Sequence, residues 1–365
     1  MNILILNPIL FSAQNNVIPK VNSIKDCMIY NIALGFNQLG HNVTLITVEE
    51  YKPQRDEVYE INVVFMHSAF KRVFLPNALP LPLRLLCYLQ RNKKNFDLII
   101  SSEIFSFSSL FAAMIAPRRT IVWHELAVHI RKMRGVPSYF WYNIVAKLFF
   151  RKVRVVARSE NAKNFAEKYV RCVSDLTVEH GINLNKFQYS SQKKKQFIVV
   201  GQLVPRKNIS SILEKFKRFI MNKQFIDYKL IIVGRGELEE ELKGQAVMLD
   251  IIENVEFAGF KTHEELNHII SESQALLIDT RQDNNMVSIP ESIVSGTPVV
   301  TNFVPTNAYT IEKHKLGIVA NWTEKDLEEM VKNNSYFVDN CISFRENLSN
   351  VNTAKSLIND FKNNL

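Results

Sequence analysis

One stretch near the carboxyl end of the chain, residues 275–302, restricts the fold more than any other. It reads ALLIDTRQDNNMVSIPESIVSGTPVVTN: an apolar run, a polar segment, apolar residues at helical spacing, a Gly-Thr-Pro stop and a second apolar run. This order is typical of a strand–loop–helix–strand unit in a parallel sheet. The polar loop should follow the carboxyl end of a strand and precede a helix. Open α/β sheets bind ligands there, and free backbone amides at that point favour an anion.

Two acids flank this loop. Asp283 lies in the polar segment, and Glu291 lies in the predicted helix. Carboxylates in these positions are suited to accepting hydrogen bonds from the hydroxyl groups of a sugar or a ribose. The alternative is a buried loop in which both acids serve only as caps.

The same alternation runs along the whole chain. Apolar runs that predict strands lie at residues 2–7, 43–48, 61–66, 98–101, 120–123, 153–156, 197–200, 229–233 and 255–257. Helical patterns separate them, for example at residues 23–39, with Ser23 as the predicted N-cap. A polar, charged stretch at 189–195 interrupts the alternation once. We therefore predict an α/β protein of two doubly wound domains, residues 1–190 and 191–351.

Composition excludes several classes of protein. The chain of 365 residues is long enough for two domains, and its 47% hydrophobic and 22% charged residues are typical of a folded protein. No apolar run approaches the ~20 residues of a membrane-spanning helix, and the first residues predict a strand rather than a signal peptide. The four cysteines form no Cys-x-x-Cys or Cys/His cluster, which indicates free thiols in a reducing cytosol and no zinc site.

Positive charge is concentrated in the first half of the chain. Residues 1–190 carry 24 Lys and Arg against 13 Asp and Glu, whereas the remainder carries 21 against 23. No helix-turn-helix, RNP or zinc-finger pattern accompanies this charge, which argues against a nucleic-acid partner. The basic residues are mixed with large apolar ones at 70–75, 81–94 and 131–154. This mixture predicts peripheral contact with an anionic membrane surface; the alternative is a core-facing helix with a solvated basic face.

A family resemblance rests on the first stretch. Asp283 and Glu291, followed by Ser-Ile-Val-Ser-Gly-Thr-Pro-Val-Val at 292–300, resemble the E-x7-E and EAMA-x-G-x-PVV signature of glycosyltransferase family 4. The resemblance implies the GT-B fold, in which two Rossmann-like domains face across a cleft and the final helix, here at about 352–365, packs back on the first domain. It also implies a retaining enzyme that uses a sugar nucleotide.

A second segment, GQLVPRKN at 201–208, resembles the family's G-R-L-x-P-x-K-G turn, whose basic residues neutralise the donor diphosphate. Gly201 and Lys207 match the pattern. The family's Arg is Gln202 here, and Arg206 could supply the missing charge. On the residues alone, this segment could equally be an ordinary strand-to-helix turn with exposed basic side chains.

Further matches follow in family order. Gly234 and Gly236 resemble a V-G-x-G-P turn that lines the nucleotide cleft, and Gly259 with Phe260 resembles an F-x-G-x segment whose backbone holds the base. His124, at the end of the strand at 120–123, matches a family histidine close to the donor sugar, although a lone histidine is more often structural.

The resemblance thus implies a set of site residues. His124 and Asp283 are the expected catalytic residues. The expected substrate-binding residues are Gly201, Gln202, Arg206, Lys207, Gly234, Gly236, Gly259, Phe260, Asn284, Asn285, Met286, Val287, Ser288 and Glu291. In this set the backbone amides of 285–288 meet the β-phosphate or the sugar, and Glu291 binds the ribose hydroxyls. Asp283 replaces the family's first Glu, and Met286 replaces a Gly, which should narrow the loop.

These features predict a hexosyltransferase that moves a sugar from a nucleotide-diphospho sugar, UDP-linked for example, to a saccharide acceptor. The acceptor should be lipid-linked and serve a bacterial surface polysaccharide such as capsule or lipopolysaccharide. We expect no cofactor and no metal, because the diphosphate site is cationic protein rather than Asp-x-Asp. The expected location is the cytoplasm, at the inner face of the plasma membrane. The alternatives are a GT-B nucleotide-sugar epimerase or phosphorylase, and a non-catalytic nucleotide-sugar-binding protein.

Overall fold

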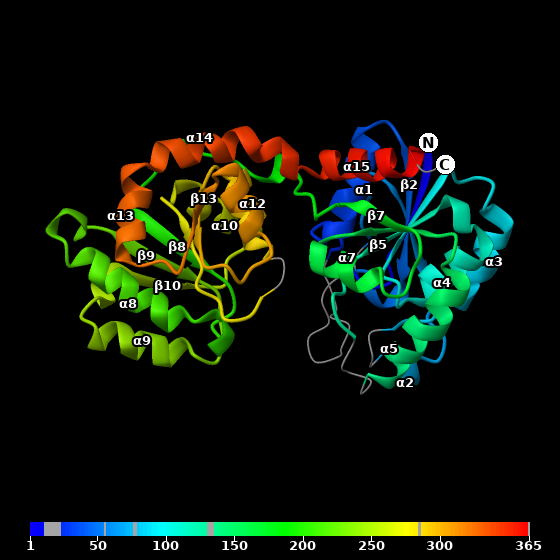
Figure 1. The fold of residues 1–365 in the computed structure, drawn as a ribbon, viewed down its shortest axis with the longest axis horizontal. Coiled ribbons are helices and arrows are strands. Elements are labelled where there is room, and N and C mark those ends of the chain that lie inside the picture. Colours follow the sequence, from blue (N-terminus) through cyan, green and yellow to red (C-terminus); the bar gives the residue numbers. More distant parts are fainter. Residues whose placement is uncertain (11–22, 55, 76–78, 130–134, 284–285, 364–365) are drawn as a thin grey trace. The chain divides into compact units, whose positions relative to one another are not determined.

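The computed structural model describes the chain except for residues 11–22, 55, 76–78, 130–134, 284–285 and 364–365. The chain packs into two compact units (Figure 1). Unit 1 comprises Met1–Asn183 together with Ser349–Leu365, and unit 2 comprises Leu184–Leu348.

Unit 1 is built on a seven-stranded parallel sheet in the order β3-β2-β1-β4-β5-β6-β7. Its strands are β1 (Asn2–Leu6), β2 (Asn42–Val48), β3 (Asn62–Met66), β4 (Leu98–Ser102), β5 (Thr120–His124), β6 (Arg154–Ala157) and β7 (Val173–Thr177). The strand order reverses between β1 and β4, so helices cover both faces of the sheet and the sheet is doubly wound.

The strands of unit 1 are apolar because both of their faces are covered. Ile3 and Ile5 of β1 belong to one buried cluster, while Leu4 and Leu6 belong to another on the opposite face. The helices of unit 1 are α1 (Met28–Gln38), α2 (Lys71–Phe74), α3 (Leu83–Asn92), α4 (Phe107–Ile115), α5 (Val136–Phe140), the π-helical η5 (Trp141–Ala146), α6 (Lys147–Phe149), α7 (Glu160–Ala166) and α15 (Asn350–Lys362).

The prediction that Ser23 caps the first helix is wrong. Helix α1 begins at Met28 with Cys27 as its N-cap. The Ser23 hydroxyl instead accepts a hydrogen bond from the Lys25 amide at 3.0 Å, within a turn that precedes the helix. A serine side chain can satisfy a local turn as readily as a helix terminus, which is why the sequence pattern did not separate the two.

Unit 2 is built on a six-stranded parallel sheet in the order β10-β9-β8-β11-β12-β13. Its strands are β8 (Gln196–Val200), β9 (Lys229–Val233), β10 (Val255–Gly259), β11 (Leu276–Leu277), β12 (Val299–Thr301) and β13 (Gly317–Val319). Its α-helices are α8 (Ile209–Ile220), α9 (Glu239–Met248), α10 (His263–Glu272), α11 (Ser288–Val294), α12 (Ala308–His314), α13 (Glu324–Lys332) and α14 (Asn334–Phe344). The order reverses between β8 and β11, and the predicted polar loop, which begins at Asp279, follows the carboxyl end of β11.

The last helix, α15, packs against α1 in unit 1 (Figure 1). Two glycines make room for its first turn, because a Cβ on Gly35 would lie 2.4 Å from the Asn350 carbonyl oxygen and a Cβ on Gly181 would lie 2.5 Å from the Asn350 Cα. Near the end of the helix, Asp360 accepts hydrogen bonds from Arg154 Nε at 3.0 Å and Arg154 Nη2 at 2.9 Å, and from the Ser174 hydroxyl. These bonds tie α15 to β6 and β7.

We expect Asp360→Ala to destabilise the protein by roughly 2–3 kcal/mol, because it leaves the partly buried Arg154 without its carboxylate. The midpoint of urea unfolding, followed by tryptophan fluorescence, checks this. Asp227→Ala is the matched control: its side chain is 74% exposed, and it should cost less than about 0.5 kcal/mol. Equal midpoints for the two variants would show that apolar packing alone holds α15.

Candidate active site

The loops after β8, β9 and β10 meet at the carboxyl edge of the unit 2 sheet. The amide of Gly201 donates to the Val233 carbonyl at 3.0 Å, and the amide of Gly234 donates to the Gly259 carbonyl at 2.8 Å. The structure therefore brings three glycines of the predicted site together at neighbouring strand ends.

Glycine is required at two of these positions because the loops approach so closely. A Cβ on Gly234 would lie 1.8 Å from the Gly201 carbonyl oxygen, and a Cβ on Gly236 would lie 2.3 Å from the Leu203 carbonyl oxygen. Both distances are far inside van der Waals contact, so any side chain would push the β9 loop away from the β8 loop. The glycine pair thus fixes the floor of the candidate site.

Lys207, Arg206 and Asp283 form one charged cluster at this edge. Lys207 ends the short 3-10 turn η7 (Pro205–Lys207), and its ammonium pairs with Asp283 Oδ2. Arg206 Nη1 lies 2.9 Å from the same carboxylate oxygen. Two predicted cations thus already share a predicted acid. An anionic ligand that binds Lys207 must therefore compete with the Asp283 carboxylate.

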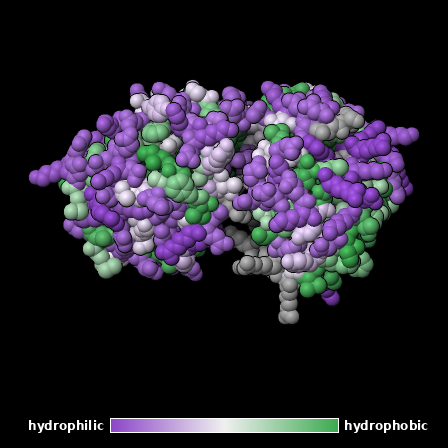
Figure 2. Space-filling view, viewed as in Figure 1, coloured by the Kyte–Doolittle hydropathy of each residue, from purple (hydrophilic) through white to green (hydrophobic). Residues whose placement is uncertain are grey.

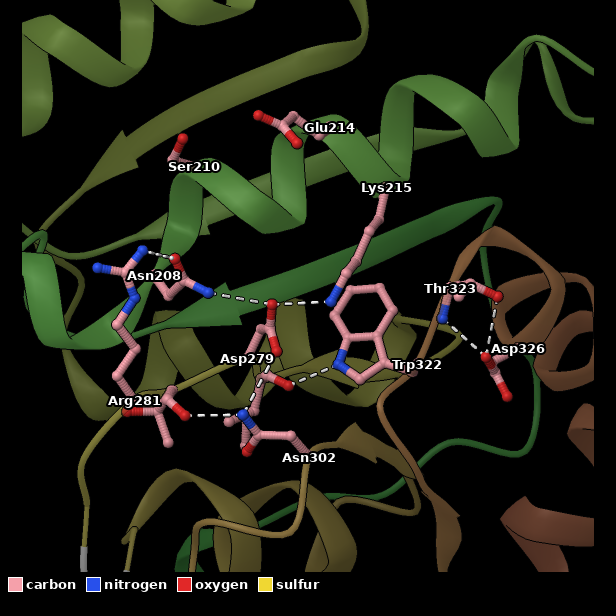
Figure 3. Close-up of polar contacts among 12 residues, drawn as sticks. Asn208, Ser210, Glu214, Lys215, Asp279, Arg281, Asn302, Trp322, Thr323 and Asp326 are labelled. Carbon is pink, nitrogen blue, oxygen red and sulfur yellow. Dashed lines mark hydrogen bonds and ion pairs between the residues drawn. The ribbon is translucent and has the colours of Figure 1, made fainter.

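A second carboxylate, Asp279, holds this turn in place from the end of β11 (Figure 3). Asp279 Oδ2 accepts hydrogen bonds from Lys215 Nζ at 2.8 Å and from Asn208 Nδ2 at 3.2 Å, and Oδ1 accepts one from Asn302 Nδ2 at 3.3 Å. Asn208 adopts a left-handed conformation, with φ of 53°, directly after Lys207. The Asp279 cluster therefore joins α8 to the ends of β11 and β12, and it fixes where the Arg206–Lys207 turn can lie.

Further contacts stabilise the Asp279 cluster. Lys215 Nζ lies 4.2 Å from the centre of the Trp322 ring, and the Trp322 indole donates to the Ile278 carbonyl at 2.8 Å (Figure 3). The Arg281 guanidinium donates to Asn208 Oδ1 at 2.9 Å. The sequence analysis did not identify Asp279 as a site residue. The feature that could have identified it is its position as the first polar residue after an apolar strand.

Glu291 lies on α11 and is buried, with 7% of its surface exposed. Burial raises the pKa of its carboxyl group to about 7. The nitrogen Nδ1 of His263 lies 4.0 Å from Glu291 Oε1. The two acids of the predicted motif therefore differ: Asp283 shares its charge with two cations, whereas the charged form of Glu291 is disfavoured by desolvation.

The remaining predicted residues lie in contrasting places. Gln202 and Phe260 are exposed, and Val287 is exposed just before α11. Met286 is buried in the core, and its amide donates to Asn307 Oδ1 at 3.0 Å. Ser288 begins α11 and is buried. Asn284 and Asn285 lie outside the described residues.

The predicted histidine of unit 1 lies in a cluster of its own. His124 ends β5 and is fully buried, and its Nδ1 lies 2.8 Å from Glu103 Oε2. Glu103 directly follows β4 and has a φ of +67°, a left-handed conformation that is uncommon for a non-glycine residue. Its carboxylate also accepts hydrogen bonds from the amides of Glu125 at 2.9 Å and Leu126 at 3.4 Å. Within the described parts of the chain, His124 Nε2 has no hydrogen-bond partner.

The next strand ends add charge to this cluster. Arg158, after β6, lies with Nη1 2.9 Å from Glu125 Oε2 and with its guanidinium 4.0 Å from the centre of the Trp123 ring. Burial opposes ionisation of Glu125, but His180 and Arg158 outweigh it and lower the pKa of this carboxyl group to about 2. Sequence reasoning missed Glu103. An acid directly after a buried apolar strand was the available signal.

Comparison with known proteins identifies the family. Residues 182–350 match the family model described as glycosyl transferases group 1, and residues 28–185 match the model described as glycosyltransferase family 4. The chain belongs to the group 1 glycosyltransferases, and its two α/β units have the predicted GT-B fold.

Individual relatives agree with this assignment. The chain is 24% identical over 324 residues to an uncharacterized glycosyltransferase of Haemophilus influenzae, which covers 85% of each chain. It is 23% identical over 167 residues to an alpha-monoglucosyldiacylglycerol synthase of Streptococcus pneumoniae, covering 41% of this chain and 37% of that protein. The structure of HepE of Anabaena in complex with UDP covers 100% of both chains with a TM-score of 0.67 and 13% identity.

Among the residues that the structure describes, no group of three or more His, Cys, Asp or Glu side chains is placed to hold a metal ion. No helix of the described chain is both long enough and apolar enough to cross a membrane.

The buried Glu291 predicts a pH-dependent stability. With a folded pKa of about 7 and an ordinary value of 4.5, the folded state keeps a proton that the unfolded state loses between these pH values. The free energy of unfolding should therefore fall as the pH rises from 5 to 8, by about 2–3 kcal/mol relative to Glu291→Gln. Urea unfolding of both proteins across this range measures the difference. Glu240→Gln, at a side chain 87% exposed, is the control and should track the wild type.

Proposed function

We propose that the protein is a retaining hexosyltransferase that moves a sugar from a nucleotide-diphospho sugar to a saccharide acceptor. The observation that carries this proposal is the cluster of Lys207, Arg206 and Asp283 on a glycine floor at the carboxyl edge of the unit 2 sheet. A cationic turn beside an acid matches a donor with a diphosphate at one end and hydroxyl groups at the other. The UDP in the HepE complex supports a nucleotide donor.

In the proposed reaction, Lys207 and Arg206 move from Asp283 to the diphosphate oxygens and stabilise the charge that develops on the leaving group. Asp283, once released, accepts hydrogen bonds from the sugar hydroxyls. Glu291 accepts hydrogen bonds from the ribose in its ionised form, and the backbone at Gly259 and Phe260 meets the base. In unit 1, His124, oriented through Nδ1 by Glu103, is the proposed catalytic histidine. The two cations balance the diphosphate charge without a metal in this scheme.

Substituting Lys207 and Asp283 separates this proposal from its alternatives. Lys207→Ala should weaken binding of UDP-, GDP- or ADP-sugar about tenfold and lower kcat by roughly 10²-fold, because a charged contact to the leaving group is lost. Asp283→Asn should bind the free nucleoside diphosphate more tightly than the wild type, since it removes the competing carboxylate, and yet should transfer more slowly. Thermal shift for binding and a product assay for transfer check both variants.

The control for these variants is Lys223→Ala, an exposed cation of unit 2 away from this edge. No thermal shift with any nucleotide sugar would overturn the donor assignment. Binding without turnover would favour the non-catalytic sugar-nucleotide protein, and release of free product without an acceptor would favour the epimerase or phosphorylase alternative.

For the acceptor, we infer a lipid-linked saccharide of a bacterial surface polysaccharide, reached from the cytoplasmic face of the plasma membrane. The helical segment at 136–149 supports this inference. Its inward face is apolar, with Trp141, Tyr142 and Ala146 buried. Its outward face is also largely apolar and carries Val136, Tyr139, Phe140, Ile144, Leu148 and Phe149. Figure 2 shows hydrophobic side chains gathered over α4 and α5 of unit 1.

A helix that is apolar on both faces needs a second apolar environment. Phe107 of α4 links α2 to this segment: the centre of its ring lies 5.2 Å from that of Phe74 and 5.3 Å from that of Trp141. Phe70 and Val73 add exposed apolar surface there. An anionic bilayer would supply this apolar environment, and its headgroups would attract the lysine and arginine side chains around the segment. A synthase named for a diacylglycerol lipid among the relatives is consistent with this.

Phe140→Ser with Leu148→Ser should reduce binding to vesicles of phosphatidylcholine and phosphatidylglycerol by at least tenfold, because two exposed apolar side chains no longer enter the bilayer. Co-sedimentation measures the partition coefficient. Met248→Ser with Val247→Ser removes comparable exposed apolar side chains from unit 2 and is the matched control. If both double variants bind like the wild type, the helical segment at 136–149 is not a bilayer contact.

A further inference from the structure

The edge of the unit 1 sheet opposite His124 carries its own array of charged side chains. Because the strands are parallel, the segments that lead into β4, β5, β6 and β7 all reach this amino edge. They contain Lys93 and Lys94, Arg118, Arg151 and Lys152, and Arg171 in turn. Four separate connections therefore place lysine or arginine side chains at one edge of the sheet.

Three adjoining pockets open among these segments. The largest, of about 610 Å³, is lined by Pro117, Leu148, Phe149, Arg151, Lys152 and Arg171. Pro117 and Lys152 also line a second pocket, and Arg151 and Arg171 also line a third, so the three pockets adjoin one another. Pockets of roughly 300–1,000 Å³ commonly hold small ligands.

The charge around these pockets is not balanced within the described chain. Their described lining holds nine lysine and arginine side chains and a single carboxylate, Glu167. Arg119 donates to the carbonyls of Lys93 and Phe96 at 3.1 Å each, and among the described residues none of the nine lies within 4.0 Å of a carboxylate. In unit 2, by contrast, exposed cations such as Lys194 and Lys243 pair with glutamates. Repulsion among unpaired cations disfavours the compact state unless an anion joins them.

The apolar part of the largest pocket indicates what kind of anion this is. Leu148 and Phe149 are exposed there, and they are the end of the helical segment at 136–149. Exposed apolar side chains next to unpaired cations match the boundary between acyl chains and phosphate headgroups. The segment runs from the carboxyl edge, after β5, to the amino edge, before β6. A bilayer along its length would therefore reach both edges of the sheet.

We propose that the amino-edge pockets bind the phosphate of an anionic phospholipid headgroup, with Arg151, Lys152, Arg171 and Arg118 as the binding cations. This rests on the bilayer contact proposed above and assigns it a second, polar site, distinct from the donor site. Headgroup binding would hold unit 1 at the membrane while the carboxyl edge receives the acceptor.

The test compares Arg151→Gln with Lys152→Gln, made together, against Arg84→Gln with Arg91→Gln, which removes the same charge from α3 of the same unit. Each cation near a bilayer contributes a factor of about five in binding, so the pocket variant should lose roughly 20- to 30-fold in its partition to phosphatidylglycerol vesicles. The α3 variant should lose clearly less. If both double variants lose the same factor in partition to the vesicles, the attraction is diffuse and electrostatic, and the proposal is wrong.

A water-soluble lipid separates the headgroup site from the bilayer contact. Dihexanoyl phosphatidylglycerol should bind the wild type and not the pocket variant in titration calorimetry, and inorganic phosphate at the same concentration should bind much more weakly. If the wild type and the pocket variant bind vesicles equally well, and the short-chain lipid does not distinguish the two proteins, the headgroup site is wrong and the bilayer contact stands. If the short-chain lipid binds at the pockets while vesicles do not bind, the bilayer contact is wrong and the headgroup site stands. Phosphate binding as tight as the lipid would overturn the headgroup assignment.

Discussion

Parallel strand pairing decides where every functional side chain of this protein can lie. Because the strands of a unit all run in one direction, residues that follow a strand gather at one edge, and residues that precede a strand gather at the other. Glu103 and His124 reach the carboxyl edge of unit 1 in this way, although they leave different strands. The same constraint brings Lys207 and Asp283 together in unit 2. Each edge therefore combines residues that are far apart in sequence.

Electrostatics then distinguishes the acids at these edges. Asp279 and Asp283 each have a cation within ion-pair distance, so their charge is compensated inside the protein. Glu291 is buried, and desolvation raises its pKa to about 7, which leaves it near half-ionised at neutral pH. A ribose that donates hydrogen bonds to the ionised form would shift this balance, so nucleotide binding and proton release should be linked at this residue. Asp283 differs from Glu291, because its carboxylate is paired with Lys207 and Arg206.

Much of the fold could be predicted from apolar periodicity, because strands covered on both faces, such as β1, β8 and β9, read as continuous apolar runs. The candidate donor-site residues were predicted from the family resemblance and from their position after strands. Periodicity reports burial, however, and not which polar side chains meet across a sheet. The Asp279 cluster depends on contacts between Asn208, Lys215 and Asn302, which no local pattern records. The backbone of Glu103, at φ +67°, was equally invisible, since its sequence carries no glycine or asparagine to mark a left-handed residue.

The two edges of the structure also handle positive charge in opposite ways. At the carboxyl edge of unit 2, Asp283 pairs with Lys207 and Arg206, so the charge of this turn is compensated before any ligand binds. A diphosphate that replaces the carboxylate exchanges one ion pair for another, which keeps the net gain from binding moderate and favours product release. At the amino edge of unit 1, the described pocket lining holds a single carboxylate, Glu167, which forms no ion pair with the nine cations. An anion bound there adds an ion pair without breaking one. The carboxyl edge of unit 2 is therefore suited to a ligand that binds and is released in each reaction cycle. The amino edge of unit 1 is suited to a ligand that stays bound.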